Sequence, residues 1–330
     1  MPRPIEALVH QDALAANLAV ARRAATGAKV WAVVKADAYG HGIAQAHAAF
    51  AKADGFALLD PAEAVRLREL GWRGPVLLLE GCFDARDLET CARFALWHVV
   101  HCREQIDLLA ALKTDRPHHV FLKMNSGMNR LGFAPDRLRA AWHRLAALAQ
   151  VETVTLMTHL ANADAGATWV RPGIALYGAS PDHPAHTAAD WGLAPAMTLR
   201  TELIATQTLA AGESIGYGAA FTAERPMRIG VAACGYADGY PRVAPAGNAR
   251  GAPVLGDGRR SRIVGRVSMD MITVARDDLA DAGVGSEVVL WGRSAGGAVL
   301  PIDEVAAAAG TLGYELMCAR APRVPTRAVP

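Results

Sequence analysis

One lysine stands where a packing role is hard to justify. Lys35 ends the apolar run WAVVK and is followed by ADAYGHG. Because an unpaired lysine is almost never fully buried, its position at the end of an apolar strand indicates a function. Burial lowers the pKa of a lysine amine and leaves a nucleophile that condenses with carbonyl groups. We therefore expect Lys35 to lie at an active site and to form a Schiff base.

The strand that carries Lys35 is one of a series of short apolar runs in the first half of the chain. Runs of this kind, without polar alternation, are typical of parallel strands buried on both faces. Alanine-rich helical stretches separate them. The expected strands cover residues 29–37, 55–60, 75–80, 96–100, 119–124, 154–160 and 170–178. Repeated strand–helix units predict a (β/α) barrel or a doubly wound sheet, and a barrel carries its chemistry at the carboxyl ends of the strands.

The expected strands are one short of a closed barrel. The chain offers seven, whereas a barrel of this class has eight. His159 and Arg171 are only 12 positions apart, and another strand–helix unit needs roughly 30 residues. The shortfall therefore lies between these two residues.

The second half of the chain has a different sequence pattern. Residues 180–192 contain two prolines and little periodicity, so we interpret them as a linker. Short β-like pieces separated by turn signals follow, as in a β-rich domain. A last helix has Asp303 as a candidate N-cap and Gly310 as a break. We predict two domains, residues 1–192 and residues 193–330.

Length, composition and charge exclude several classes of protein. The chain has 330 residues, 52% of them apolar and 20% charged, with a net charge of +2. These values predict a globular protein that binds neither nucleic acid nor membranes. Glu6 and Asp12 interrupt the stretch where a signal peptide needs an apolar core. Five cysteines without a CxxC pair, and histidines without metal-ligand spacing, predict a cytoplasmic protein with free thiols and no metal.

Several motifs resemble those of one enzyme family, the alanine racemases. KADAYGHG (35–42) is similar to the family's pyridoxal-phosphate attachment motif. Further segments resemble family motifs in the family's order: KMNSGMNRLGF (123–133), MTHLANAD (157–164), VRPGIALYG (170–178), GYADGYPR (235–242), GRVSMD (265–270) and GYELMCARAPRVP (313–325). The resemblance runs nearly end to end, and the chain is identified on these motifs as a member of the family.

The resemblance implies a fold, a cofactor and two catalytic residues. The fold would be a (β/α)8 barrel that binds pyridoxal 5'-phosphate, followed by a mainly β domain, in a head-to-tail homodimer. Lys35 would hold the cofactor as an internal aldimine and act as the base for D-alanine. Tyr236 would come from the other subunit and act on L-alanine from the opposite face. Racemisation needs two such groups, because one removes the α-proton and the other returns a proton from behind.

The resemblance also implies supporting roles. Arg171 would face the pyridine nitrogen and, because a guanidinium keeps its proton, leave that nitrogen largely unprotonated. His159 would lie beside the ring. Arg130 and the main-chain amide of Met269 would bind the substrate carboxylate. Lys123 would be the family's carbamylated lysine, which orients Arg130.

The cofactor phosphate is the place where the chain departs from the family pattern. Tyr39, Tyr314 and the amides of Gly173 and Ile174 would bind it. Family members add a helix and a strand between MTHLANAD and VRPG, with an asparagine and a serine for the phosphate and a histidine that braces the arginine. Asn162 belongs to the preceding motif, so we do not transfer the role to it. The loss of two such hydrogen bonds corresponds to roughly 10²–10⁴ in affinity.

The apparent internal deletion, between residues 164 and 170, leaves alternatives open. We expect the barrel to survive in a distorted or seven-stranded form, with an open edge near the cofactor. A natural deletion, an engineered one and a defective gene model all yield this sequence. The leading hypothesis is an alanine racemase that supplies D-alanine for the cell wall or degrades it. The alternatives are a remnant that binds cofactor or dimerises without turnover, and a racemase of wider substrate range.

Overall fold

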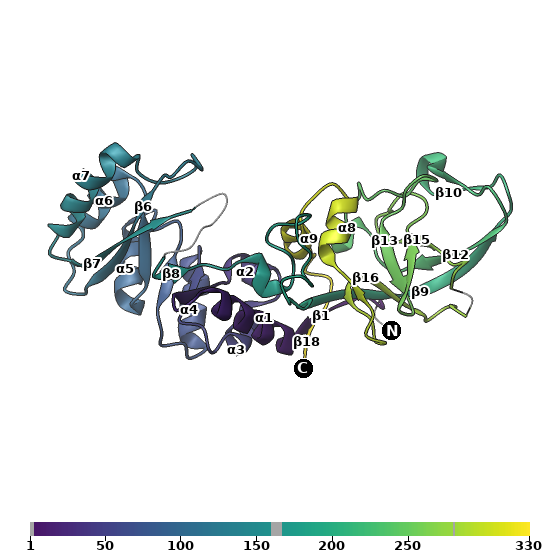
Figure 1. Ribbon diagram of the computed structural model, residues 1–330, viewed down its shortest axis with the longest axis horizontal. Coiled ribbons are helices and arrows are strands. Elements are labelled where there is room, and N and C mark those ends of the chain that lie inside the picture. The colour runs from purple at the N-terminus through teal and green to yellow at the C-terminus, as the bar shows by residue number, and fades with distance from the viewer. Residues whose placement is uncertain (1–2, 160–166, 280) are drawn as a thin grey trace. The chain divides into compact units, whose positions relative to one another are not determined.

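The computed structural model describes residues 3–159, 167–279 and 281–330 (Figure 1). Two compact units divide the chain. We call Arg22–Ala38 with Phe50–Pro172 the barrel unit, and Met1–Ala21, Tyr39–Ala49 and Gly173–Pro330 the β unit. The two units alternate along the chain, and the domain boundary between residues 192 and 193 stays a prediction. No helix in the described ranges has the length and apolar character that crossing a bilayer requires.

A parallel sheet of seven strands forms the core of the barrel unit. Its strands are β2 (Lys29–Val33), β3 (Gly55–Leu58), β4 (Val76–Leu78), β5 (Trp97–Val100), β6 (His118–Met124), β7 (Val151–Thr158) and β8 (Trp169–Val170). Every residue of β3 and β4 is buried, as expected of a parallel sheet covered on both faces. The helices between the strands are α4 (Pro61–Glu69), α5 (Ala85–Phe94), α6 (Arg103–Ala111) and α7 (Pro135–Ala146).

The helices begin where the sequence supplies caps. The Asp60 carboxylate accepts a hydrogen bond from the Ala62 amide at 2.8 Å, and Pro61 occupies the first turn of α4. The Asp84 carboxylate accepts one from the Asp87 amide at 3.0 Å at the start of α5. Such caps satisfy amides that have no partner inside the helix. The two N-caps define where α4 and α5 begin, and therefore how far the chain continues after the preceding strand before it becomes helical.

The sheet is open, and β7 and β8 are its two ends. The strand order is β7-β6-β5-β4-β3-β2-β8, with every neighbouring pair parallel. Among the described residues no strand pairing joins β7 to β8. The predicted fold class, a (β/α)8-type barrel short of one strand–helix unit followed by a mainly β domain, is confirmed, and the barrel sheet is open in the described residues. Residues 160–166, which include Asn162 and the first part of the region of the apparent deletion, lie outside the described residues.

The strand expected over 170–178 is only partly correct. β8 ends at Val170, and residues Ile174–Tyr177 form a 3-10 helix, η1. Pro172 has no amide proton to donate to a ladder, and Gly173 takes φ −110 and ψ −100 outside the strand region. The backbone therefore leaves the sheet at Arg171 and turns into η1.

The β unit is built on one long strand, β9 (Met197–Leu209). Its main sheet has the order β14-β13-β16-β9-β1-β18, and β12 also pairs with β9. The remaining strands are β1 (Glu6–His10), β10 (Ser214–Ile215), β11 (Phe221–Thr222), β12 (Met227–Ala232), β13 (Pro253–Gly256), β14 (Arg259–Arg262), β15 (Ile272–Ala275), β16 (Glu287–Arg293), β17 (Val299–Leu300) and β18 (Thr326–Val329). The helices are α1 (Gln11–Ala24), which continues to Ala24 of the barrel unit, α3 (Ile43–Ala49), η2 (Tyr217–Ala219), η3 (Tyr236–Asp238), α8 (Ile302–Ala308) and α9 (Gly313–Cys318).

The last helical region is broken, as predicted, but it is capped differently. α8 follows Pro301, and Asp303 lies inside its first turn, where it accepts a hydrogen bond from the Ser180 amide at 2.8 Å. Gly310 takes a positive φ of 72° between α8 and α9. Asp303 is therefore a tether for residue 180 rather than a helix cap.

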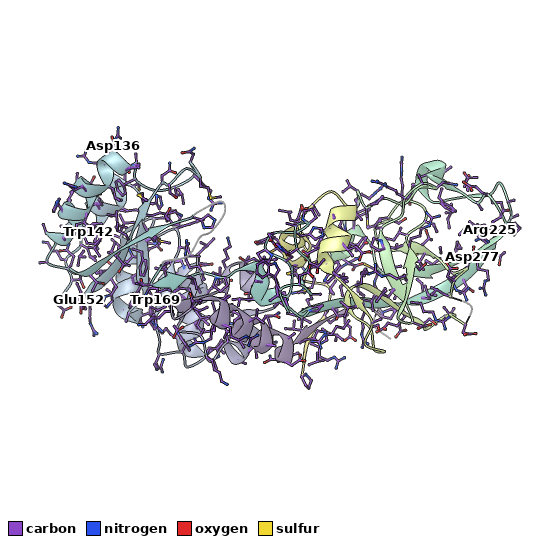
Figure 2. All side chains as sticks on the ribbon, in the orientation of Figure 1. Asp136, Trp142, Glu152, Trp169, Arg225 and Asp277 are labelled. Carbon is purple, nitrogen blue, oxygen red and sulfur yellow. The ribbon has the colours of Figure 1, made fainter. Side chains whose placement is uncertain are left out.

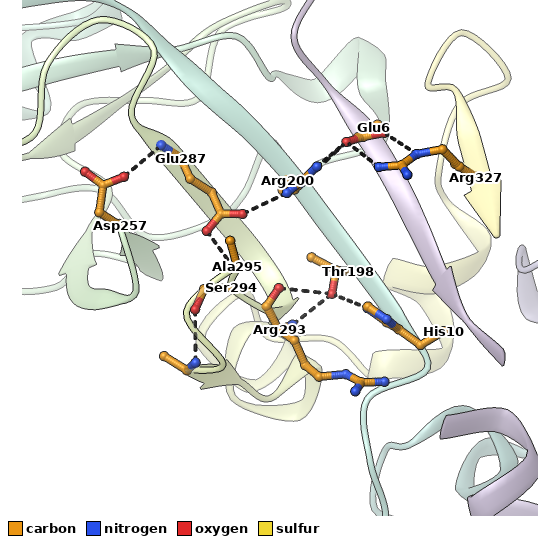
Figure 3. Close-up of polar contacts among 11 residues, drawn as sticks. Glu6, His10, Thr198, Arg200, Asp257, Glu287, Arg293, Ser294, Ala295 and Arg327 are labelled. Carbon is orange, nitrogen blue, oxygen red and sulfur yellow. Dashed lines mark hydrogen bonds and ion pairs between the residues drawn. The ribbon is translucent and has the colours of Figure 1, made fainter. Parts of the chain in front are cut away.

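Ion pairs and hydrogen bonds cross-link the central strands of the β unit (Figure 3). Arg200 of β9 donates to Glu6 of β1 at 2.6 Å and to Glu287 of β16 at 3.2 Å. His10 of β1 shares a 2.8 Å hydrogen bond with the hydroxyl of Thr198 on β9. Burial, with the Arg293 cation nearby, lowers the pKa of His10 to about 4. His10 is therefore a neutral core histidine at physiological pH.

Candidate functional site

A cavity of about 420 Å³ lies at the carboxyl ends of the barrel-unit strands. It is lined by Lys35, Leu59, Leu79, Glu80, Phe83, His101, Lys123, Arg130, Leu131, His159 and Arg171. His159 and Arg171 directly follow β7 and β8, and Lys123 is the second-to-last residue of β6. Since the ends of parallel strands meet at one edge of the sheet, residues far apart in sequence are brought together there. The cavity gathers five of the residues that the sequence analysis singled out.

Positive charge dominates this cavity. Lys35, Lys123, Arg130 and Arg171 line it together with one carboxylate, Glu80. Lys123 is only 6% exposed. Burial lowers its pKa, and the Arg171 and Arg130 cations lower it further, whereas Glu80 acts in the opposite direction. The Lys123 amine therefore carries more of the neutral, nucleophilic form than an ordinary lysine.

His159 shares the environment of Lys123. Burial lowers its pKa, and the Arg171 cation is the next largest cause. Both effects favour a neutral imidazole, whose flat face can pack beside an aromatic ring. A neutral imidazole is compatible with the predicted role beside a pyridine ring.

Arg171 connects the two ends of the open sheet. Its guanidinium donates a hydrogen bond from Nη2 to the backbone carbonyl of Thr158 at 2.5 Å. Thr158 is the last residue of β7, and Arg171 directly follows β8. Burial lowers the pKa of Arg171 from its high ordinary value. This hydrogen bond orients the guanidinium in the cavity, and its acceptor is a backbone carbonyl rather than a side chain.

The chain after Lys35 adopts a left-handed helical turn, α2 (Lys35–Tyr39). Ala36, Asp37, Ala38 and Tyr39 all have φ between 50° and 56°. Each such residue costs roughly 1–2 kcal/mol, and strain of this kind is concentrated at functional sites. The Glu63 carboxylate supports the turn by accepting a hydrogen bond from the Asp37 amide at 2.7 Å. The turn sets the directions in which the flanking Lys35 and Tyr39 leave the backbone.

In the β unit, the Tyr39 side chain lies close to Tyr177, Tyr314 and Gly173. The Tyr39 ring lies 4.5 Å from the Tyr177 ring and 5.8 Å from the Tyr314 ring, centroid to centroid. A Cβ at Gly173 would lie 2.8 Å from the Tyr39 hydroxyl, so that hydroxyl rests against the Gly173 backbone. Burial raises the pKa of Tyr39 and of Tyr314, so both phenols stay protonated.

This donor set is suited to an anion. Within the described residues, the amides of Gly173 and Ile174 donate no hydrogen bond to another group. Two phenol hydroxyls and two amides therefore present protons, and a phosphate group offers the oxygens that would accept them. The predicted phosphate-binding residues are thus neighbours in one unit and chemically fit the group.

Tyr236 and Met269 also lie together in the β unit. The Tyr236 amide donates to the Ser268 carbonyl and the Ala237 amide to the Met269 carbonyl, both at 3.0 Å. The buried Asp238 carboxylate accepts from the Gly235 amide at 2.9 Å and pairs with Arg323 at 2.7 Å. The Tyr236 side chain is 40% exposed and that of Met269 is 53% exposed. A rigid turn therefore holds an accessible phenol.

Some residues of the site were not found by sequence reasoning. Glu80 is the one carboxylate in the cavity lining, Thr158 holds Arg171 through its backbone, and the Gln105 amide donates to the carbonyls of Glu80 at 2.9 Å and Cys82 at 3.2 Å. Glu80 was detectable as a polar residue ending an apolar strand. A backbone carbonyl leaves no signal in the sequence.

Two histidines that lack metal-ligand spacing pack in the core of the barrel unit. His98 and His118 are buried and share a 3.1 Å hydrogen bond between Nε2 and Nδ1. In the part of the chain that the structure describes, no group of three or more His, Cys, Asp or Glu side chains is placed to hold a metal ion.

Known proteins match this chain over nearly its whole length. The family model "Alanine racemase, N-terminal domain" matches residues 9–168, and "Alanine racemase, C-terminal domain" matches residues 196–328. Alanine racemase of Polaromonas sp. strain JS666 is 60% identical over 98% of this chain and 99% of its own length. That of Methylibium petroleiphilum strain PM1 is 59% identical over 99% of each.

Solved structures agree with these matches. The biosynthetic alanine racemase of Pseudomonas aeruginosa superposes with a TM-score of 0.93 at 42% identity, covering 99% of this chain and 100% of its own. The alanine racemase of Acinetobacter baumannii gives 0.88 at 32% identity, covering 99% and 100%. The alignment with the Polaromonas protein spans 364 positions, so at least 34 of them (364 minus 330) face gaps in this chain. This relative therefore carries residues that the present chain lacks.

Proposed function

The chain belongs to the alanine racemase family, and we propose that Lys35 and Tyr236 are the two groups that exchange the α-proton in its reaction. It is an isomerase that interconverts L-alanine and D-alanine. The observation that carries the proposal is the gathering of Lys35, Lys123, Arg130, His159 and Arg171 around one cavity. The comparisons support the enzyme rather than the non-catalytic remnant.

The cofactor proposed for the site is pyridoxal 5'-phosphate, on which the family depends. Tyr39, Tyr314 and the amides of Gly173 and Ile174 would hold its phosphate. When bound, the cofactor supplies an electron sink that stabilises the negative charge left at Cα by removal of the α-proton. The donor set of the β unit supports this assignment, since it offers hydroxyl and amide protons to an anion.

Lys35 and Tyr236 divide the proton transfers. The Lys35 amine would hold the cofactor, and it would accept or return the α-proton on the D-alanine side. The Tyr236 phenol would do the same on the L-alanine side. A homodimer in which each subunit lends its Tyr236 to the other is part of the proposal, and the exposed phenol on a rigid turn supports it.

Arg171 and His159 would set the environment of the pyridine ring. A guanidinium keeps its proton, so Arg171 would leave the ring nitrogen largely unprotonated. This limits delocalisation of charge into the ring and keeps the proton transfers at Cα. The hydrogen bond from Arg171 to Thr158 supports this role, because it orients the guanidinium. A neutral His159 would pack against the ring.

Arg130, Lys123 and Met269 would bind the substrate. The Arg130 guanidinium and the Met269 amide would take the alanine carboxylate. Lys123 would carry a carbamate, formed when its neutral amine adds to carbon dioxide and loses a proton. Its lowered pKa favours the reactive amine, and the change from a cation to an anion would reduce the excess of positive charge in the cavity. The carbamate would then hold Arg130 in place.

Substitution of each base in turn tests the proposal. Tyr236→Phe, which removes only the hydroxyl, should abolish racemisation in both directions while pyridoxal phosphate still binds. Lys35→Ala should lose racemisation and covalent attachment of the cofactor together. The matched control is Tyr217→Phe, at another exposed tyrosine of the β unit, which should keep activity. Normal turnover by the Tyr236→Phe enzyme would refute the assignment.

A further inference from the structure

Two cysteine thiols of the barrel unit are in contact. The Cys82 and Cys91 sulfur atoms lie 3.5 Å apart and share a hydrogen bond. Both are free thiols, and their side chains are only 3% and 1% exposed. Cys91 lies on α5, labelled in Figure 1, and Cys82 lies on the segment between β4 and α5. Figure 2 draws the side chains of this unit as sticks. Neither thiol has a part in the reaction proposed above, so their contact indicates another chemistry.

The backbone before Cys82 is held in place. The buried Gln105 side-chain amide donates to the carbonyls of Glu80 at 2.9 Å and Cys82 at 3.2 Å. Between these carbonyls Gly81 takes a positive φ of 79°, and a Cβ there would lie 2.1 Å from the Val99 carbonyl oxygen. The segment from Glu80 to Cys82 is therefore packed too closely to shift without disturbing its neighbours.

Helix α5 is anchored at both of its ends. At its start, the Asp84 carboxylate accepts a hydrogen bond from the Asp87 amide at 3.0 Å, and the Asp87 carboxylate accepts one from the Phe83 amide at 2.8 Å. At its end, the Cys91 carbonyl accepts a hydrogen bond from the Leu96 amide at 2.9 Å. The two sulfur atoms therefore lie on two well-held segments. They need to approach by about 1.5 Å to reach the length of a disulfide bond.

The two thiols are not equivalent. The hydrogen bond to Cys91 raises the pKa of the Cys82 thiol, and burial raises it further. Cys82 is therefore the thiol that keeps its proton and donates it to the Cys91 sulfur. A hydrogen bond that a sulfur accepts stabilises its thiolate form, and the thiolate is the nucleophile in oxidation. Cys91 is thus suited to attack an oxidant, and Cys82 is suited to resolve the product.

The pair lies next to the active-site cavity. Glu80, two positions before Cys82, and Phe83, directly after it, both line that cavity. Phe83 is 68% exposed, so the buried Cys82 is one residue away from an exposed position. A small oxidant therefore has a short path to the pair. A bond between the two sulfur atoms would connect the wall of the cavity to α5.

We propose that Cys82 and Cys91 are a redox-active pair, which hydrogen peroxide converts to a disulfide and a thiol reductant restores. The disulfide ties the segment that carries Glu80 and Phe83 to α5. Because Gln105 already holds this segment, the bond restrains the cavity wall without displacing it. The oxidised enzyme therefore keeps its racemase activity.

The oxidation balances with peroxide as the only co-reactant. The Cys91 thiolate attacks one oxygen of hydrogen peroxide, the O–O bond breaks, and a sulfenic acid and hydroxide form. The hydroxide takes up the proton that Cys91 released and becomes the first water. The Cys82 sulfur then attacks the Cys91 sulfur and breaks its S–O bond, and the leaving hydroxide and the Cys82 proton form the second water. The two thiols lose two electrons, and peroxide gains them.

The test treats the full-length protein, saturated with pyridoxal phosphate, with one equivalent of hydrogen peroxide. Remaining thiols are alkylated, and trypsin digestion follows without a reductant. Cleavage after Arg73, Arg86 and Arg93 places Cys82 on residues 74–86 and Cys91 on residues 87–93. Mass spectrometry should find these two peptides joined with the loss of two hydrogen atoms, and dithiothreitol should separate them.

Oxidation in urea shows whether the folded geometry selects the pair. Cys91 is 9 positions after Cys82 and 11 positions before Cys102, so an unfolded chain has little preference between the two partners. In the folded protein, the pairing of Cys82 with Cys91 should exceed that of Cys91 with Cys102 at least tenfold. In urea the two pairings should occur in similar amounts.

Two variants assign the roles of the thiols. Cys82→Ser removes the resolving thiol, so oxidation should stop at a sulfenic acid on Cys91, which dimedone traps on residues 87–93. Cys102→Ser is the matched control at a partly exposed cysteine of the same unit, and it should form the joined peptides as the parent does. For the oxidised parent, kcat/KM for L-alanine should stay within twofold of the reduced value. Hydrogen exchange of the Phe83 and Asp87 amides should slow at least threefold.

Three outcomes would overturn the proposal. Oxidised, folded protein without the joined peptides, or with both pairings in equal amounts, would show that the contact does not direct disulfide formation. A dimedone adduct on Cys102 instead of Cys91 in the Cys82→Ser variant would place the reactive thiol elsewhere. A loss of kcat/KM of more than twofold that dithiothreitol reverses would show that the bond displaces the cavity wall.

Discussion

Arg171 donates a hydrogen bond to the backbone carbonyl of Thr158 at 2.5 Å, and this contact spans the opening of the seven-stranded sheet. The two residues stand at the ends of strands that do not pair with each other. A backbone acceptor also means that no side-chain substitution at residue 158 removes the contact. The orientation of the guanidinium therefore depends on how β7 ends.

Replacement of Arg171 by lysine should separate the contribution of the positive charge to stability from that of the planar guanidinium group. Lys keeps the cation but loses the planar fork that can bond Thr158 and a ligand at once. A hydrogen bond to a charged group contributes roughly 1.5–3 kcal/mol, so Arg171→Lys should lower the free energy of unfolding by about that amount. Urea unfolding of the cofactor-free protein measures it. A variant as stable as the parent would show that the contact does not hold the strand ends.

Substitutions at Lys123 should reveal whether a negative charge acts there. Lys123→Glu supplies a fixed carboxylate, whereas Lys123→Met keeps the apolar stem alone. If a carbamate holds Arg130, the Glu variant should retain at least tenfold more kcat/KM for L-alanine than the Met variant. Intact-mass measurement in bicarbonate should find the mass of one added carbon dioxide on the parent enzyme and none on either variant. Equal activity of the two variants would contradict a charged role.

Ala in place of Gly173 should weaken cofactor binding. The new Cβ would lie 2.8 Å from the Tyr39 hydroxyl and would displace it. We expect a loss of at least tenfold in affinity for pyridoxal phosphate, measured by spectroscopic titration; a tenfold loss corresponds to about 1.4 kcal/mol. Gly283→Ala is the control, because no atom lies within 4 Å of a Cβ built there. Equal affinities in both variants would remove Tyr39 and Gly173 from the phosphate site.

Stability should fall as the pH is lowered from about 6.5 to 4 because of His10. Burial, with the Arg293 cation nearby, lowers its pKa from 6.5 to about 4 in the folded state. In this window the unfolded chain binds a proton that the folded chain does not, so unfolding becomes easier as the pH falls. The loss from this residue is on the order of 3 kcal/mol.

His10→Gln keeps a hydrogen-bonding side chain but does not titrate, so the pH dependence of its unfolding free energy should be flatter. His143→Gln, at an exposed histidine of α7, should leave the slope unchanged. Chemical denaturation at several pH values measures both. Parallel curves for the parent and His10→Gln would show that His10 titrates normally.

The features of the fold that follow from periodicity and counting were predictable. Uninterrupted apolar runs indicated the parallel strands, and the separation of only 12 positions from His159 to Arg171 located the missing unit. The strand expected over 170–178 was wrong after Val170, because Pro172 and Gly173 turn the backbone into η1. The backbone preferences of Pro172 and Gly173 favour a turn, whereas the apolar pattern of residues 170–178 favours a strand. The structure has the turn.

The rest of the site depends on contacts that no local pattern encodes. Four residues without a glycine among them, Ala36 to Tyr39, take left-handed backbone angles, although each alone disfavours them. The Arg171–Thr158 bond uses a backbone carbonyl, which every residue has. The interleaving of the two units along the chain likewise reflects long-range packing rather than composition.

Proton exchange at the α-carbon of alanine tests the central claim, that Lys35 and Tyr236 form a working pair in a chain whose barrel sheet is open. The enzyme, saturated with pyridoxal phosphate, is incubated with L-alanine in heavy water, and NMR with a chiral assay follows deuterium and configuration. We expect deuterated D-alanine from the parent enzyme, and loss of inversion with Tyr236→Phe. Folded, cofactor-bound parent protein that yields neither exchange nor D-alanine would contradict it.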